Sequence, residues 1–110
     1  MANATFTFTL DSFKITDTRS RHNDTDFVSF TMLVKPKTGS GTPHTLTKAM
    51  GDVNNGVHPV NLSFPNVSVG PAQSVVLNYL IVNSGHQNPS EVEKGLESAG
   101  TKLATLSWAL

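Results

Sequence analysis

Apolar and polar residues alternate along most of residues 4–82. In the first such segment, Phe6, Phe8 and Leu10 alternate with threonines. A period of two places one face of a segment against a core and the other in water, which is typical of a half-buried β-strand. The segments with this pattern are 4–10, 26–34, 44–50, 57–64 and 67–69. We therefore predict antiparallel strands that are separated by polar turns.

One further segment, residues 74–82, is apolar at nearly every position. Because a strand covered on both faces has no polar side, this segment is predicted to be the central strand. The first strand changes phase at Asp11 and Ser12, which indicates a β-bulge. Pro59 lacks a backbone donor and therefore predicts an edge strand. The side chains expected in the core are Phe6, Phe8, Phe30, Leu62, Phe64, Leu77, Tyr79 and Ile81.

The last segment of the chain has a helical period. Asn88 is a good N-cap, Pro89 suits the first helical position, and Glu91 completes a capping box. Apolar residues then recur every four and three positions, which at about 100° per residue confines them to an arc of about 80°. They are Val92, Leu96, Ala99, Leu103, Leu106 and Leu110. Gly100 leaves an alternative open, because glycine often ends a helix and residues 101–110 would then form a closing strand.

The apolar stripe of this helix needs a surface to cover it, since an isolated helix of this length is marginally stable in water. Its spacing is that of a coiled-coil seam, so we expect it to meet another helix. That helix would belong to a second copy of the chain or to a downstream segment. The alternative is that the stripe packs on the chain's own β-sandwich. The candidate partner-binding residues are Val92, Leu96, Leu103, Leu106 and Leu110.

Charge and composition exclude several classes of protein. The chain has eight basic and eight acidic residues, and a net charge of zero argues against electrostatic capture of nucleic acid. It has no cysteine, so disulfides and thiolate metal sites are excluded. We expect no signal peptide and no direct membrane insertion, because the sequence has neither a basic start nor an apolar run of about 20 residues.

Three polar loops, at residues 16–25, 51–56 and 83–88, follow alternate strands. In an up-and-down arrangement these connections would meet at one end of the protein. Calcium prefers about six to eight oxygen ligands, which carboxylates and amides from several loops could supply. The candidate metal ligands are Asp17, Asp24, Asp26, Asp52 and Asn54. The alternative is that these residues only form turns, for which Asp and Asn are well suited.

These patterns together predict an antiparallel β-sandwich of five to seven strands with a C-terminal amphipathic helix. The domain boundaries expected are residues 1–87 for the β-sandwich and 88–110 for the helix. No catalytic motif is present, so we expect a protein that is not an enzyme. The function expected is a binding module that uses the polar loops, with Ca²⁺ as the only candidate cofactor. The alternative is a structural or self-assembly domain that associates through its helix.

Overall fold

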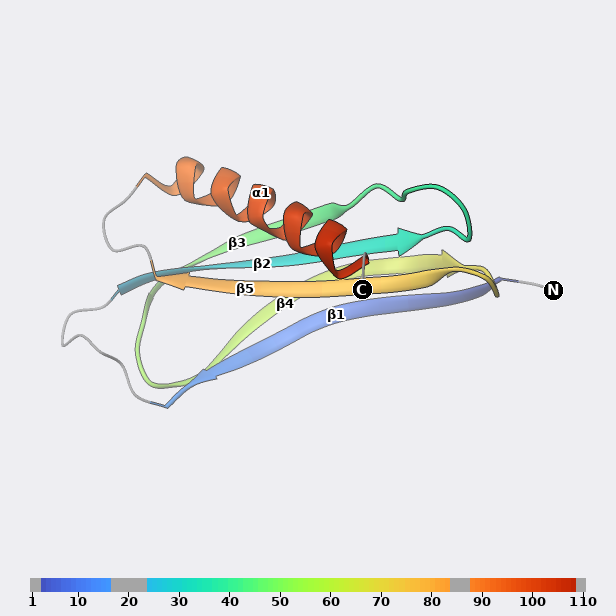
Figure 1. Cartoon of the computed structure of the whole chain (residues 1–110). Helices are drawn as coiled ribbons and strands as arrows, with labels where there is room; N and C mark the ends of the chain where they lie inside the picture. The colour runs from blue at the N-terminus through green and yellow to red at the C-terminus, as the bar shows by residue number, and fades with distance from the viewer. Residues whose placement is uncertain (1–2, 17–23, 84–87, 109–110) are drawn as a thin grey trace.

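Five strands and one helix form the protein (Figure 1), and a computed structural model describes residues 3–16, 24–83 and 88–108. The elements are β1 (Ala4–Ile15), β2 (Asp24–Lys35), β3 (His44–Val53), β4 (Gly56–Val69), β5 (Ser74–Asn83) and α1 (Pro89–Trp108). The protein is therefore mainly β, with two antiparallel sheets and a C-terminal helix. The strand predicted at residues 67–69 is the end of β4.

The larger sheet has the order β3-β2-β5, so β2 is its central strand. Phe30 of β2 pairs with Leu46 on one side and with Tyr79 on the other. All of residues 26–33 are buried, because the helix covers one face of β2 and the smaller sheet covers the other. The prediction that residues 74–82 form the central strand is therefore wrong. They belong to β5, an edge strand that pairs only with β2.

The smaller sheet is an antiparallel ladder of β1 and β4. Its register shifts twice, and at each shift β4 has two residues against one in β1. One shift lies between Leu10 and Ser12, where the sequence predicts a bulge. Asn61 and Asn66 of β4 lie at these shifts with φ of 56°, a left-handed conformation that asparagine adopts more easily than most residues. The irregularity lies where it was predicted, but a bulge in the first strand itself is wrong, because the extra residue belongs to β4.

One part of the core lies between the two sheets. The rings of Phe30 and Phe64 approach with centroids 5.3 Å apart, and Met32 is buried beside them. The apolar residues packed against this cluster are Phe8, Leu10, Val34, Leu46, Leu62, Val67 and Val75. On the β3 side, Lys48 Nζ donates a hydrogen bond to Val60 O at 2.8 Å and so joins β3 to β4.

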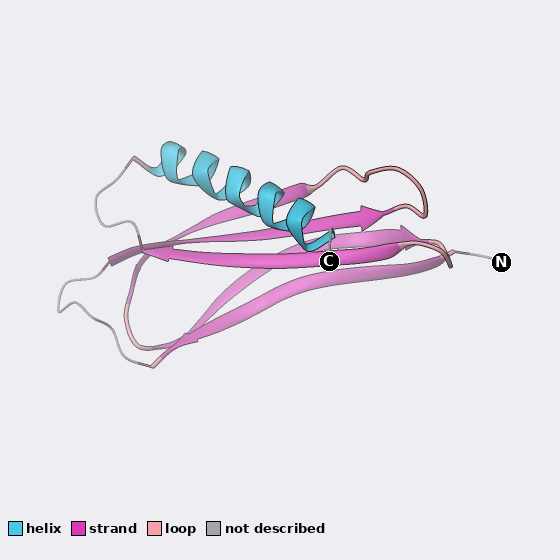
Figure 2. Cartoon of the chain, viewed as in Figure 1, coloured by secondary structure: helices cyan, strands magenta, loops and turns pink. Residues whose placement is uncertain are grey.

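The helix covers the opposite face of the three-stranded sheet (Figure 2). Val92 and Leu96 pack on Phe27 of β2, with Leu80 of β5 beside them. Farther along, Gly100 and Ala104 are buried. A Cβ at position 100 would collide with Thr31 Oγ1, so the helix approaches the sheet closely at this point.

Two predictions concern the ends of the helix: its start at Asn88 and its possible end at Gly100. Asn88 Oδ1 accepts a hydrogen bond from the backbone N of Ser90 at 3.0 Å, and Asn88 O accepts one from the backbone N of Val92 at 3.2 Å. Asn88 is thus the N-cap, as predicted. The helix continues past Gly100 to Trp108. The alternative of a closing strand at residues 101–110 is wrong for the described part, 101–108.

The molecule is elongated and has a large accessible surface for its mass. Its extents are 54 × 23 × 23 Å and its radius of gyration is 15.8 Å, whereas a compact chain of this length has a radius of about 13 Å. Its accessible surface is 7106 Å², against about 5,900 Å² for a typical monomer of this mass. The excess of about 1,200 Å² is comparable in size to a protein interface.

Candidate functional site

The strand ends that border the three polar loops lie at one end of the protein (Figure 1), as an up-and-down order predicts. Asp24, at the start of β2, pairs with Val53 at the end of β3, and Asp26 pairs with Asn83 at the end of β5. At this end the β1–β4 ladder diverges from the larger sheet, so the two sheets have separate tips (Figure 1).

Strand pairing between β2 and β3 places the backbone of three candidate metal ligands close together. The register places Asp52 opposite Thr25, between the positions of Asp24 and Asp26. Asp26 is buried, with 7% of its surface exposed, and it already interacts with other groups of the protein. Asn54 is exposed, and its backbone O accepts a hydrogen bond from His58 Nε2 at 2.5 Å.

The remaining part of the metal prediction lies outside the described structure. Asp17 belongs to residues 17–23, which are not described, and the side chains of Asp24 and Asp52 are not described either. Among the described residues, no group of three or more His, Asp or Glu side chains could hold a metal ion. Calcium binding at this end therefore stays a prediction.

Two open spaces flank Tyr79 between β5 and β1. One, of about 420 Å³, is lined by Phe8, Phe30 and Leu77 among others. The other, of about 400 Å³, is lined by Leu10, Phe13, Val60 and Ile81 among others. Tyr79 lines both spaces, and we refer to the two together as the groove on the β1–β5 side. Their lining is mainly apolar, with Thr7, Thr9, Ser12 and Lys14 as polar members from β1.

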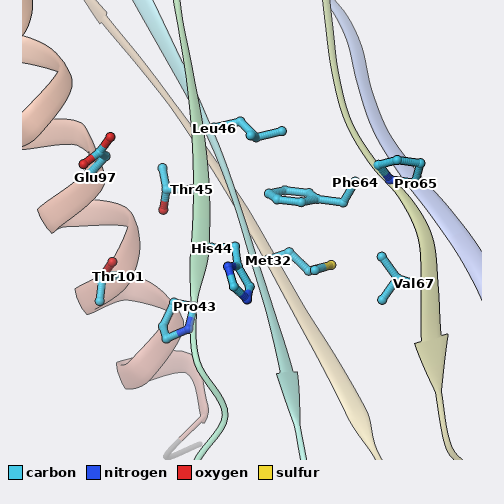
Figure 3. A pocket seen from close by; sticks show the side chains of 10 residues that line it. All are labelled: Met32, Pro43, His44, Thr45, Leu46, Phe64, Pro65, Val67, Glu97 and Thr101. Atoms are coloured by element: carbon cyan, nitrogen blue, oxygen red, sulfur yellow. The ribbon is translucent and has the colours of Figure 1, made fainter.

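A third space, of about 610 Å³, lies on the opposite side of the molecule, around β3 (Figure 3). Met32, Leu46 and Phe64 point into the gap between β3 and β4, while Glu97 and Thr101 project from the helix on the other side of β3. No catalytic set of side chains converges in this space among the described residues.

Apolar side chains are exposed along β5 and on the second half of α1. Tyr79 is 60% exposed and Leu106 is 66% exposed. The full set is Leu77, Tyr79, Ile81 and Val82 of β5 with Leu103 and Leu106 of α1, and we refer to it as the β5–α1 surface. The expectation that Phe6, Leu77, Tyr79 and Ile81 lie in the core is wrong, because the groove between β1 and β5 is open.

The helix and β5 contributions lie toward the same edge of the larger sheet but on opposite faces of it. Leu77, Tyr79 and Ile81 line the spaces toward β1, whereas the helix covers the other face. Asn78 Nδ2 of β5 donates a hydrogen bond to Gly100 O of the helix at 3.1 Å. Thr101 faces β3, where it lines a space with Thr45. Leu103 and Leu106 are rotated from Thr101 by roughly 140–160° around the helix axis, so they lie on the side of the helix away from β3.

The predicted partner-binding stripe is divided by the fold. Val92 and Leu96 are buried in the chain's own core, against Phe27. Leu103 and Leu106 are exposed, and Leu110 lies outside the described residues. The inward face follows positions 92, 96, 100 and 104, so the 4-3 stripe of the sequence covers both a buried and an exposed face.

The four free strand edges differ in chemistry. The β1 edge has Asp11 and Lys14, the β3 edge has Lys48, and β4 has Pro59 and Pro65. Charges and prolines of this kind protect an edge from pairing with another chain. Residues 74–83 of β5 contain no Asp, Glu, Lys, Arg or Pro. Among the described strands, β5 alone thus has an unprotected edge.

The sequence contains the signal for this surface, since the apolar run at residues 74–82 is unmistakable. The apolar run predicts a strand but not its place in the sheet, and the structure places it at an edge with Leu77, Tyr79 and Ile81 exposed. No helix in the described ranges is long and apolar enough to cross a membrane. Scans against protein-family models, curated proteins and solved structures gave no match for this chain.

Proposed function

We propose that this protein is a non-catalytic assembly domain, and that its partner at the β5–α1 surface is a second copy of the same chain. The observation that carries the proposal is the unprotected edge of β5, flanked by exposed apolar side chains. An exposed, long, apolar edge strand is prone to uncontrolled aggregation when nothing covers it. A second copy removes that hazard.

The size of the surface supports a stable dimer. With about 200 Å² for each fully exposed large side chain, the six residues of the β5–α1 surface expose about 600 Å². Stable interfaces bury about 800 Å² on each partner. The backbone of the β5 edge and the polar residues around it would supply the remaining area.

The charge pattern favours a second copy over an unlike partner. In a two-fold interface each residue meets the same patch of its copy, so any cluster of like charge opposes itself. Residues 74–83 have no charged side chain, and the only titratable group among them is Tyr79. The strand can therefore meet its own copy without electrostatic repulsion.

We further propose that the two sheets of each copy pack as a β-sandwich, through the cluster of Phe30, Met32 and Phe64. The sandwich is bridged on the β3–β4 side by the hydrogen bond from Lys48 Nζ to Val60 O, beside the space that Met32, Leu46 and Phe64 line. It stays open on the β1–β5 side, which is the side that the second copy would cover.

A second candidate function is ligand binding by the polar loops, because the strand ends that border them lie at one end of the protein (Figure 1). Loops held on rigid sheets commonly carry binding sites. Calcium would be the cofactor of that function, and it is compatible with dimer formation at β5.

Sedimentation velocity and light scattering test the assembly. The natural chain should be a dimer whose fraction rises with protein concentration. Tyr79→Lys should be monomeric and still folded by circular dichroism, because the lysine places like charges across the interface. The matched control is Val57→Lys, since Val57 is 65% exposed but lies on β4. The proposal is contradicted if the natural chain sediments only as a monomer, even when its protein concentration is raised about 100-fold.

A further inference from the structure

We propose that β5 pairs antiparallel with β5 of a second copy, with Tyr79 on the two-fold axis. The two three-stranded sheets then form one six-stranded sheet of order β3-β2-β5-β5-β2-β3. This inference rests on the proposed assembly function and specifies its geometry. The alternative geometries are helix-to-helix contact alone and β5 pairing in another register.

Strand pairing follows from the backbone as well as from the side chains. β5 uses one edge to pair with β2 over ten residue pairs, from Asp26–Asn83 to Lys35–Ser74. Its other edge has no strand beside it in the described structure, so a row of backbone N–H and C=O groups faces outward. A second β5 satisfies those groups. Contact through the helix alone would leave them unpaired beside exposed Leu77 and Ile81.

Two-fold symmetry restricts the register. An axis perpendicular to the sheet keeps each face of the sheet on the same side in both copies. Residues directly opposite each other must then come from the same face, and faces alternate along a strand. The axis must therefore pass between one residue and the same residue of the copy, so that these two lie directly opposite each other. The central residues of β5 are Asn78 and Tyr79, so the two registers with nearly full overlap pair either Asn78 or Tyr79 with its own copy.

The environment of the two central residues favours Tyr79. The Asn78 amide is turned into the protein, since its Nδ2 binds Gly100 O and its Oδ1 is buried without a partner. The Asn78 side chain is therefore held beneath the helix. Tyr79, in contrast, is 60% exposed and lies on the groove side of β5.

The Tyr79 register also pairs the exposed residues with one another. It places Leu77 opposite Ile81 of the copy, on both sides of the central tyrosine pair. Side chains directly opposite each other on one face of an antiparallel pair contact one another, so this register buries the exposed residues against their counterparts. In the Asn78 register, Ile81 would instead lie opposite Val75, and Tyr79 opposite Leu77.

Because the chain has no cysteine, disulfide trapping can read the register directly. Side chains directly opposite in an antiparallel pair have Cβ atoms about 4.5–5.5 Å apart, close enough for a disulfide after a small adjustment. Tyr79→Cys should form a reducible dimer under mild oxidation. The double variant Leu77→Cys/Ile81→Cys should do so as well, and it keeps the central tyrosine.

The control for random collision is Val57→Cys, whose site is as exposed as that of Tyr79. Residues held opposite each other have an effective concentration in the millimolar range, so at about 10 μM protein the Tyr79→Cys dimer should form about 100-fold faster than the Val57→Cys dimer. Equal rates of disulfide formation in Tyr79→Cys and Val57→Cys would overturn the proposed pairing of β5 with β5.

Two other outcomes separate this inference from the assembly proposal. A natural chain that is dimeric while Asn78→Cys cross-links and Tyr79→Cys does not overturns the register and keeps the assembly. A dimer that no β5 cysteine traps, but that Leu106→Lys dissociates, overturns strand pairing in favour of helix contact. A natural chain that is monomeric overturns both proposals.

Discussion

Gly95 and Gly100 lie in the same helix but in opposite environments, so one substitution should have opposite effects at the two sites. A Cβ at Gly95 would have no atom within 4 Å. A Cβ at Gly100 would collide with Thr31 Oγ1 and lie 3.3 Å from Thr45 Oγ1. Those two hydroxyls are hydrogen-bonded to each other at 2.8 Å and cannot easily move apart.

The magnitudes follow from these contacts. Alanine is about 0.8–1 kcal/mol better than glycine inside a helix, so Gly95→Ala should stabilise the protein by about that amount. At Gly100 the same gain is opposed by overpacking, which costs about 1–3 kcal/mol. Gly100→Ala should therefore be less stable than Gly95→Ala by about 1–3 kcal/mol.

Urea unfolding at one fixed protein concentration measures both variants, because the proposed dimer would make stability depend on concentration. Thr31→Ala removes the hydroxyl that collides, so a double-mutant cycle with Gly100→Ala should show a favourable coupling of about 0.5–3 kcal/mol. If Gly100→Ala is as stabilising as Gly95→Ala, the close approach of helix and sheet is refuted.

Three further predictions concern the core, the bulges and the polar loops. Phe64→Ala should lower the free energy of unfolding by about 3–5 kcal/mol, whereas Phe6→Ala, at a half-exposed site, should cost less than half of that; equal losses in denaturant titrations would contradict the assigned core. Asn66→Val should cost about 1–2 kcal/mol and Asn66→Gly almost nothing, because valine resists the left-handed conformation; similar melting temperatures of the two variants would argue against the bulge. If the polar loops bind calcium, the melting temperature should rise from excess EDTA to millimolar calcium; identical melting curves would end the calcium hypothesis.

Local signals in the sequence were sufficient for the individual elements. The alternation around Phe8 predicted β1, and the phase change before Phe13 predicted a bulge. Asn88 marked the start of the helix. These features depend on residues close together in the chain, which is why they can be derived without the tertiary structure.

Which strand lies at the centre of the sheet could not be derived in the same way. β5 is the more apolar strand, yet β2 is central, with Ser29 and Thr31 fully buried beneath the helix. Small side chains are suited to this position because Gly100 brings the helix close to the sheet. β2 is buried because its small side chains fit beneath the closely packed helix, whereas hydropathy alone predicts β5 as the central strand.

The candidate site shows the same limit. That the strand ends beside the polar loops lie at one end could be predicted from strand order, but the exposed apolar surface could not. It depends on Leu103 and Leu106 facing away from a sheet that Val92 and Leu96 cover, and all four lie on one stripe in a helical projection. The direction in which the helix crosses the strands decides which of them are buried.

The pairing of β1 with β4 has a consequence for the order of folding. β2 and β3 are joined by residues 36–43 and can pair as soon as both exist, whereas the partner of Ile15 is Gly56, 41 positions later. At a synthesis rate of about 5–20 residues per second, the completed β1 waits for about 3–11 s before all of β4 has been made. Such long-range pairing also slows folding in solution. The threonines that alternate with Phe6 and Phe8 make one face of the waiting strand polar, and so limit its association with other chains during that interval.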